Sequence, residues 1–332
     1  MRNPVFDIMK GVGILAMIAG HTDIPGLLVK VIFAWHMPLF FLVSGYFFRP
    51  QSLIEAWRKN ISALIIPYLL TAIVMLILCM GYVVMGIDRD IIRAFAAIFI
   101  GAGSRGVPML GEYSIGAIWF LLAMFWCKII YNYVSIRYSS EYKSGGVILS
   151  LSVLGTYAGT QTYLPTDVLQ GVSAMLFFGI GHQMAKIGIP KRISRWKMIC
   201  GFLLLTMSLY SSYVDGGKDV PLSMVRCHYT YYPVNVLAAL FCIHVIYVFS
   251  TYVVRWKYVC QSLEYWGRIS LLILCVHIID LDYGVINYAC TRMLGTGVAA
   301  KTCMLAGHLG VALCGSWILA RIPVVRSVFH IR

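Results

Sequence analysis

The sequence has little charge, and acidic side chains are especially scarce. Only 12% of its 332 residues are charged, 13 of them Asp or Glu, whereas 60% are hydrophobic. In ordinary globular domains about a quarter of the residues are charged. This composition excludes a sizeable soluble domain. We therefore expect one all-α polytopic membrane bundle over residues 1–332.

Several motifs are also missing. The ten cysteines are scattered without a C-x-x-C pair, which is typical of small buried hydrophobic residues rather than of disulfides or zinc sites. The sequence has no G-x-S-x-G turn and no glycine-rich phosphate loop, which excludes serine hydrolases and nucleotide-driven pumps. No group of His, Cys and Asp has metal-ligand spacing, so no metal is expected.

The net charge is nevertheless +14, from 27 Lys and Arg residues. Such a charge is also found in nucleic-acid-binding proteins. In a membrane protein these cations are better explained as topology signals and phosphate contacts. We expect membrane lipids as partners and no nucleic acid.

Apolar stretches recur along the chain, and about 20 such residues cross a bilayer as a helix. The first lacks a signal-peptide cleavage site and reads as an uncleaved helix. Residues 87–100 are amphipathic and read as interfacial or re-entrant, and 101–108 are too rich in glycine to span. The ten predicted spans are about 5–23, 30–48, 61–82, 115–136, 146–161, 168–186, 198–214, 233–254, 268–285 and 298–320.

The distribution of Lys and Arg predicts the orientation, because cytoplasmic loops carry an excess of both. With the N-terminus inside, the connecting segments place roughly twice as many of these residues on the cytoplasmic side as outside. Both termini are then cytoplasmic. We expect a multi-pass protein of the plasma or inner membrane.

The first predicted helix carries Lys10 near one end and His21 at the other, with no ionisable residue between them. Eleven residues make about three helical turns, so both side chains share a face about 16 Å apart. The next span contains His36 and Pro38. Ionisable residues inside spans are costly and usually mark function.

These segments carry a resemblance. Phe6-Asp-Ile-Met-Lys-Gly-Val-Gly-Ile-Leu15 with Gly20-His21, and then His36-Met-Pro-Leu-Phe-Phe41, resemble the opening of the acyltransferase 3 family of membrane O-acyltransferases. The likeness is closest to the branch that acetylates sugars. Ile118-Trp-Phe-Leu121 and Leu263-Glu-Tyr-Trp-Gly-Arg268 to His277 resemble later spans of that family.

The resemblance implies that an acetyl group moves from cytoplasmic acetyl-CoA to a hydroxyl of an extracytoplasmic sugar, in a polysaccharide or a glycolipid. His21 would be the general base, since histidine suits that role near neutral pH. It could instead be a core histidine that bonds a backbone carbonyl. His36 would orient His21, contact the substrate, or only hydrogen-bond between helices. Lys10 stands where the family usually has arginine. The positive charge is kept, but the planar guanidinium group, which can bind a phosphate through two parallel hydrogen bonds, is lost.

Cofactor phosphates require clustered cations on the cytoplasmic side. We expect Lys10, Arg58 and Lys59 to bind acetyl-CoA, with Asp7 one turn before Lys10 as its ion-pair partner or as a substrate contact. Topology alone also explains any single one of these cations. The cluster within 191–197 is typical of a loop against anionic lipid.

The acceptor would meet the outer segment 215–235, where Arg226 and Asn235 are the best candidates. Tyrosines in the same segment also serve as interfacial anchors. Trp119 and Glu112 would border the same cavity, and His277 would line the acyl path. The remaining histidines without a visible partner, 182, 244 and 308, are expected to be structural.

Two other classes of function stay open. A secondary transporter would also have about ten helices with buried histidines, but no internal repeat is visible and the spans hold few carboxylates. A membrane sensor or docking protein without turnover is the other alternative, which the presence of both Lys10 and His21 disfavours.

Overall fold

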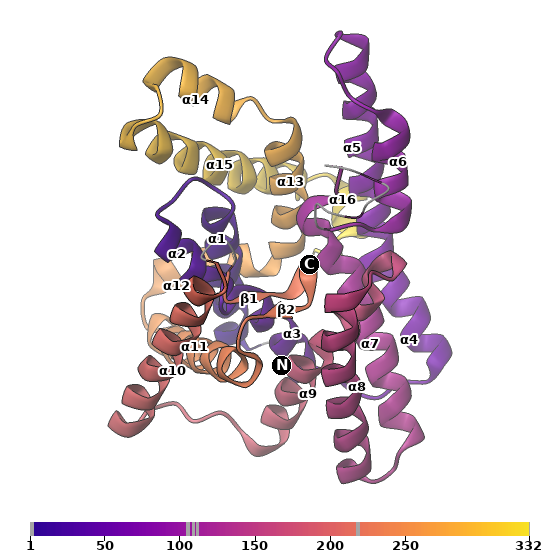
Figure 1. The fold of residues 1–332 in the computed structure, drawn as a ribbon, viewed down its shortest axis with the longest axis vertical. Coiled ribbons are helices and arrows are strands. Elements are labelled where there is room, and N and C mark those ends of the chain that lie inside the picture. Colours follow the sequence, from indigo (N-terminus) through magenta and orange to yellow (C-terminus); the bar gives the residue numbers. More distant parts are fainter. Residues whose placement is uncertain (1–2, 104–106, 108–109, 111–112, 217–219, 332) are drawn as a thin grey trace.

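The protein is almost entirely helical (Figure 1). The computed structural model describes residues 3–103, 107, 110, 113–216 and 220–331. Short 3₁₀ or π turns precede several helices, and one two-residue hairpin (β1 Leu222–Ser223, β2 His228–Tyr229) lies before α11. The helices are α1 Pro4–Gly20, α2 Gly26–Phe33, α3 His36–Tyr46, α4 Leu53–Asn60, α5 Ile66–Val84, α6 Ile91–Ile100, α7 Trp119–Arg137, α8 Glu141–Gln161, α9 Val168–Ile187, α10 Arg195–Val214, α11 Tyr232–Val253, α12 Lys257–Arg268, α13 Ser270–Tyr283, α14 Ile286–Leu294, α15 Val298–Leu319 and α16 Pro323–Val328.

All ten predicted spans fall on helices, which confirms the all-α bundle. Six helical stretches within the described residues are long and apolar enough to cross a membrane, or seven if the bent pair α12 and α13 is one span. The stretches at α1, α8 and α9 are helical but do not meet that requirement of length and composition. The number ten therefore stays a prediction.

One predicted span is interrupted, and another begins at a sharp bend. The span expected over 30–48 consists of α2 and α3, separated at Trp35, whose φ of −139° is not helical. The backbone turns by 71° between α12 and α13, at Ile269. The first break makes His36 the first residue of α3. The first break lies within a predicted span, whereas the bend at Ile269 follows the amphipathic helix α12.

Reciprocal glycines bring two pairs of helices into close contact. A Cβ atom at Gly11 of α1 would meet the Leu263 carbonyl of α12, and one at Gly267 would meet the Asp7 carbonyl. Gly45 and Gly181 join α3 to α9 in the same way. Small residues allow such backbone approach in membrane bundles, where packing replaces the hydrophobic effect as the driving force.

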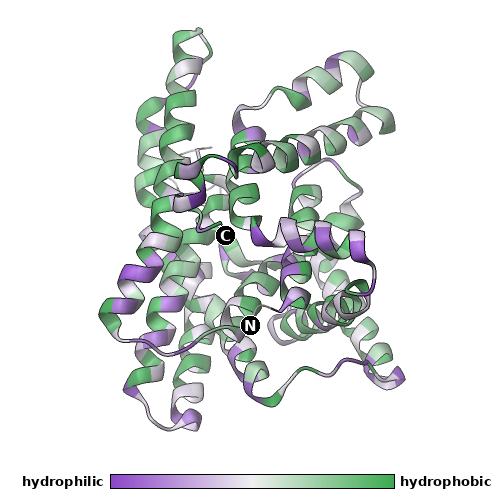
Figure 2. Ribbon diagram, turned by 180° about the vertical axis from the view of Figure 1, so that it is seen from behind, coloured by the Kyte–Doolittle hydropathy of each residue, from purple (hydrophilic) through white to green (hydrophobic). Residues whose placement is uncertain are grey.

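Hydrophobic residues occupy most of the length of the long helices (Figure 2), and many of them are exposed. On α5, for example, Ile73 and Ile77 are more than half exposed. Exposed apolar surface of this extent indicates a lipid environment. The structure thus supports a multi-pass membrane protein.

Polar contacts between distant segments join residues expected on the same side of the membrane. Lys301 and Asp23, both expected outside, form a 3.0 Å ion pair. On the cytoplasmic side, Lys186 bonds Glu141 at 2.8 Å. The two-sided arrangement is therefore consistent with the charge distribution, and the assignment of one side as cytoplasmic stays a prediction.

Candidate functional site

The Lys10 end of α1 faces a polar cavity of about 290 Å³, which we call the cationic cavity. It lies between α1, α3, α4 and α7. Four basic side chains line it, and they come from three helices and one loop: Lys10 from α1, Arg49 from the loop before α4, Lys59 from α4 and Lys128 from α7. The polar lining residues are Lys10, Ser44, Arg49, Gln51, Lys59, Asn60, Lys128 and Asn132.

Local structure positions these cations. Lys10 pairs with Asp7 at 2.7 Å, so the predicted ion pair is present, with the Asp7 side chain only 7% exposed. Ser52 and Glu55 form a capping box at the start of α4, and Lys59 follows in its last turn. Beyond Asn60 the helix continues through a π turn (Ile61–Ile65) into α5, so Lys59 is held within one continuous helical stretch.

Two reciprocal hydrogen bonds attach the loop before α4 to α7. The Gln51 amide donates to Asn132 Oδ1 at 3.0 Å, and Asn132 Nδ2 donates to the Gln51 carbonyl at 2.9 Å. This clamp keeps Arg49 and Lys59 opposite Lys128. Sequence reasoning had left Lys128 unassigned within its span, although a lysine in an apolar run is itself a signal of function.

Arg58 does not line the cationic cavity. It lines a second cavity, of about 820 Å³, which shares Gln51 and Lys59 with the first. His330, after α16, closes part of its wall, with Nε2 3.1 Å from Ser62 Oγ. Of the three cations predicted to bind the cofactor, Lys10 and Lys59 line the cationic cavity together, whereas Arg58 lines the adjoining second cavity.

His21 ends α1, and its tautomer follows from its hydrogen bond. Nδ1 lies 2.8 Å from the Met17 carbonyl oxygen. A carbonyl can only accept, so Nδ1 carries the hydrogen of the neutral ring and Nε2 keeps its lone pair. The backbone bond expected of a structural histidine is present, yet it leaves the basic nitrogen available.

Phe33 lies beside both predicted catalytic histidines. Its ring centroid is 5.4 Å from that of His21 and 4.8 Å from that of His36. His36 is 1% exposed, and its Nδ1 donates to the Ile32 carbonyl at 2.9 Å. The two imidazoles therefore have the same tautomer and share an aromatic neighbour.

A second group of polar side chains is buried beside His21. The rings of His21 and His277 are 6.0 Å apart, and those of His277 and His308 are 6.0 Å apart. His308 Nδ1 lies 2.6 Å from Asp280 Oδ2, which corrects the expectation that His308 has no partner. His277, Asp280 and His308 also offer donor atoms within 4.8 Å of one another, and the expectation that the protein binds no metal stays a prediction. Spacing along the sequence does not reveal this cluster, because His308 comes from α15 whereas His277 and Asp280 lie on α13.

The other two unassigned histidines have partners as well. His182 Nδ1 is 2.9 Å from the Tyr131 hydroxyl. His244 Nε2 donates to the Pro190 carbonyl at 2.8 Å. His182 lies in the last two turns of α9 and His244 in the middle of α11, and their contacts agree with a structural role.

The predicted acceptor residues are dispersed. Trp119, 6% exposed, begins α7 and contacts Phe120 and the backbone at Gly103. Arg226 is exposed in the short turn between β1 and β2. Glu112 lies outside the described residues. No described contact joins Trp119 or Arg226 to His21.

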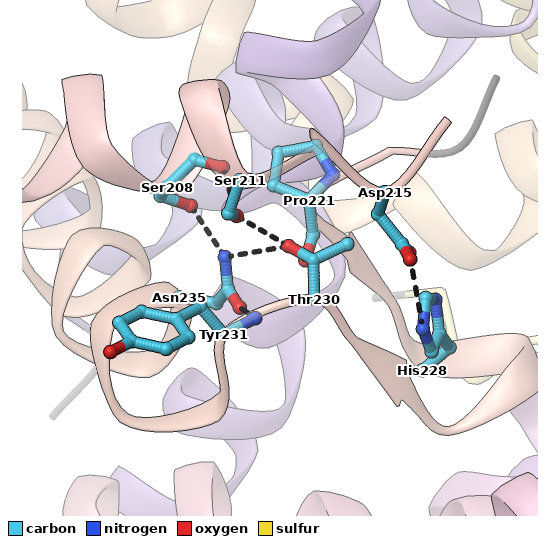
Figure 3. A network of polar contacts seen from close by, with 8 residues as sticks. All are labelled: Ser208, Ser211, Asp215, Pro221, His228, Thr230, Tyr231 and Asn235. Atoms are coloured by element: carbon cyan, nitrogen blue, oxygen red, sulfur yellow. Dashed lines mark hydrogen bonds and ion pairs between the residues drawn. The ribbon is translucent and has the colours of Figure 1, made fainter. Parts of the chain in front are cut away.

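Asn235 is buried in a network that ties the outer segment to α10 (Figure 3). Its Nδ2 donates to Ser208 Oγ at 2.8 Å, and its Oδ1 accepts from the backbone amide of Tyr231. These bonds cap the start of α11. Asn235 therefore stabilises the conformation of the outer segment 215–235 and its contact with α10.

Comparison with known proteins gives one match. A family model described as an acyltransferase domain, Acyl_transf_3, matches residues 3–321. No curated protein and no solved structure matches the chain. Because the match covers nearly the whole chain, including both ends of α1, the protein belongs to the acyltransferase 3 family and is a membrane acyltransferase.

Proposed function

We propose that this acyltransferase moves an acetyl group from cytoplasmic acetyl-CoA to a hydroxyl of an extracytoplasmic sugar, in a polysaccharide or a lipid-linked glycan. The observation that carries the proposal is the construction of α1. One end faces the cationic cavity, and the other presents His21 with a basic Nε2. A donor held at one end thus has its reaction partner at the other.

The cationic cavity suits the donor. Coenzyme A carries three phosphates, and clustered Lys and Arg bind phosphate oxygens through charge-assisted hydrogen bonds. Lys10, Lys59 and Lys128 converge on the cavity, and Arg49 adds a fourth cation. The adjoining 820 Å³ cavity beside Arg58 offers room for the nucleotide.

The two ends of α1 are separated by a distance that an extended donor can cover. From Lys10 to His21 the helix rises about 16 Å. The long pantetheine arm of coenzyme A would run along this helix and carry the thioester to the histidine end. This arrangement explains how a cytoplasmic donor serves an acceptor on the other side.

In the proposed step, His21 Nε2 takes the proton of the acceptor hydroxyl while the oxygen attacks the thioester carbonyl. The carbon–oxygen bond forms, the carbon–sulfur bond breaks, and the leaving thiolate receives the proton from His21. The Nδ1 bond to Met17 keeps the correct nitrogen directed at the reaction. His36 and His277 line the same end, and Arg226 and Trp119 are proposed to contact the glycan.

The family assignment favours this enzyme over a transporter. No described feature specifically supports solute transport. The location in the plasma or inner membrane follows from the same proposal, because the donor is cytoplasmic and the acceptor lies outside.

The test measures saturable binding of acetyl-CoA to the purified protein in detergent. Acetyl-dephospho-CoA, which lacks the 3′-phosphate, is the matched ligand control, and Lys59→Ala and His21→Ala are the variants. We expect weaker binding for the control ligand and for Lys59→Ala, with His21→Ala unchanged. Absence of binding by folded wild-type protein would contradict the proposal and turn attention to transport.

A further inference from the structure

His277, Asp280 and His308 form a buried cluster beside His21, and the proposed reaction assigns no proton transfer to any of the three. His277 and Asp280 lie three residues apart and so share one face of α13, and α15 packs His308 against them. The three side chains are 0%, 7% and 1% exposed. One donor atom from each lies within 4.8 Å of the other two.

His277 lacks the partners that its neighbours have. Neither of its ring nitrogens has a hydrogen-bond partner within the described residues. A buried polar group left unsatisfied costs about 1–3 kcal/mol. An imidazole kept in such a position beside a carboxylate and a second imidazole indicates a ligand between them.

His308 is held in the manner of a metal ligand. Its Nε2 lies 2.9 Å from Asn287 Oδ1, while Nδ1 faces Asp280 at 2.6 Å. A histidine that binds a metal usually donates its other ring N–H to an oxygen of a neighbouring residue. Asn287 supplies that oxygen, which leaves Nδ1 directed at the cluster.

We propose that His277, Asp280 and His308 bind a divalent transition-metal ion, with Zn²⁺ as the best match. Two imidazoles and one carboxylate are a common set of three protein ligands for zinc, and they leave one position open. Binding would displace the proton between His308 and Asp280, because ligands must be deprotonated. His277 would then gain the partner it lacks.

The first experiment measures metal content by mass spectrometry after purification without chelators, and then titrates Zn²⁺ into chelator-treated protein. His277→Leu is the decisive variant, since it removes one ligand but breaks no hydrogen bond of the described residues. We expect about one ion per wild-type chain and an affinity at least tenfold lower in the variant. His244→Ala, a histidine bonded to Pro190 elsewhere, should behave as wild type.

Asn287→Ala tests the outer partner. Loss of such partners typically weakens metal affinity about 10–100-fold. Gel filtration would establish that each variant stays folded. If folded wild-type protein binds no Zn²⁺, or binds it as well after His277→Leu, the proposal is wrong. These readouts need no acyl donor, so they are independent of the proposed function.

Discussion

The Lys10 end and the His21 end of α1 lie in opposite electrostatic environments, one polar and cationic, the other buried and largely apolar. At the first, four cations share a polar cavity, and the Lys10 side chain is 27% exposed. At the second, His36 and His277 are almost fully buried, His36 against the ring of Phe33 and His277 between the rings of His21 and His308 and near the Asp280 carboxylate. Like charges are tolerable in a hydrated cavity, because water and a phosphate ligand screen them. A proton acceptor among apolar neighbours must be neutral at rest, and an imidazole reaches that state near neutral pH more readily than an ammonium group.

In the proposed function, the same helix would separate donor binding from acetyl transfer. Changes at the Lys10 end should alter donor affinity, and changes at the His21 end should alter turnover. Four predictions test this separation, starting with the largest effect.

His21→Ala should lower the rate of acetyl transfer about 10²–10⁴-fold, the usual contribution of a general base. Acetyl-CoA affinity should be unchanged, since the cationic cavity lies at the other end of the helix. The rate is measured as label transferred from acetyl-CoA to an isolated cell-envelope glycan fraction. Only neutral imidazole accepts a proton, so the wild-type rate should also fall toward acid pH. His244→Ala is the control, and a rate that is flat on the acid side would count against a histidine base.

Lys128→Met should weaken acetyl-CoA binding about 10–100-fold, because a hydrogen bond to a charged group contributes about 1.5–3 kcal/mol. Direct binding in detergent measures this change. Lys143→Met is the matched control, since Lys143 is an exposed cation at the start of α8, away from both cavities. Equal losses in the two variants would mean that general positive charge, rather than the cationic cavity, attracts the donor.

Gly267→Ala should destabilise the protein by about 1–3 kcal/mol, the usual cost of overpacking. Its added Cβ would meet the Asp7 carbonyl and push α12 away from α1, which carries both ends of the site. Gly145→Ala in α8 is the control, because nothing lies near its Cβ and a helical Gly→Ala change stabilises by about 0.5–1 kcal/mol. Thermal unfolding in detergent should show shifts of opposite sign.

Glu141→Gln should have the smallest effect. A hydrogen bond from Lys186 lowers the pKa of the Glu141 carboxyl, and the Glu141 side chain is 66% exposed. The pair thus stabilises the fold above the ordinary titration range of glutamate and is lost as pH falls through the lowered pKa. Because exposed pairs contribute little, unfolding temperatures of wild type and variant should differ slightly at neutral pH and converge in acid. A large difference at neutral pH would contradict this assignment.

Much of this protein could be predicted from its sequence. Scarce charge and long apolar runs dictate a membrane bundle, since backbone groups in lipid must bond within helices. The spacing from Lys10 to His21 sets both on one helix by geometry alone, and the pairing of Asp7 with Lys10 is a local contact. The family resemblance rested on these same short stretches.

Tertiary structure alone decided which distant side chains meet. Lys128 and Asn132 line the cationic cavity and Arg58 does not, because the packing of α4 against α7 determines which side chains face the cavity. His308 joined Asp280 across 28 residues because α15 lies along α13. The break at Trp35 divides a predicted span, and the bend at Ile269 joins the amphipathic helix α12 to the apolar helix α13. Hydrophobicity determines that a segment is buried, but only packing between helices determines which of its faces meets which partner.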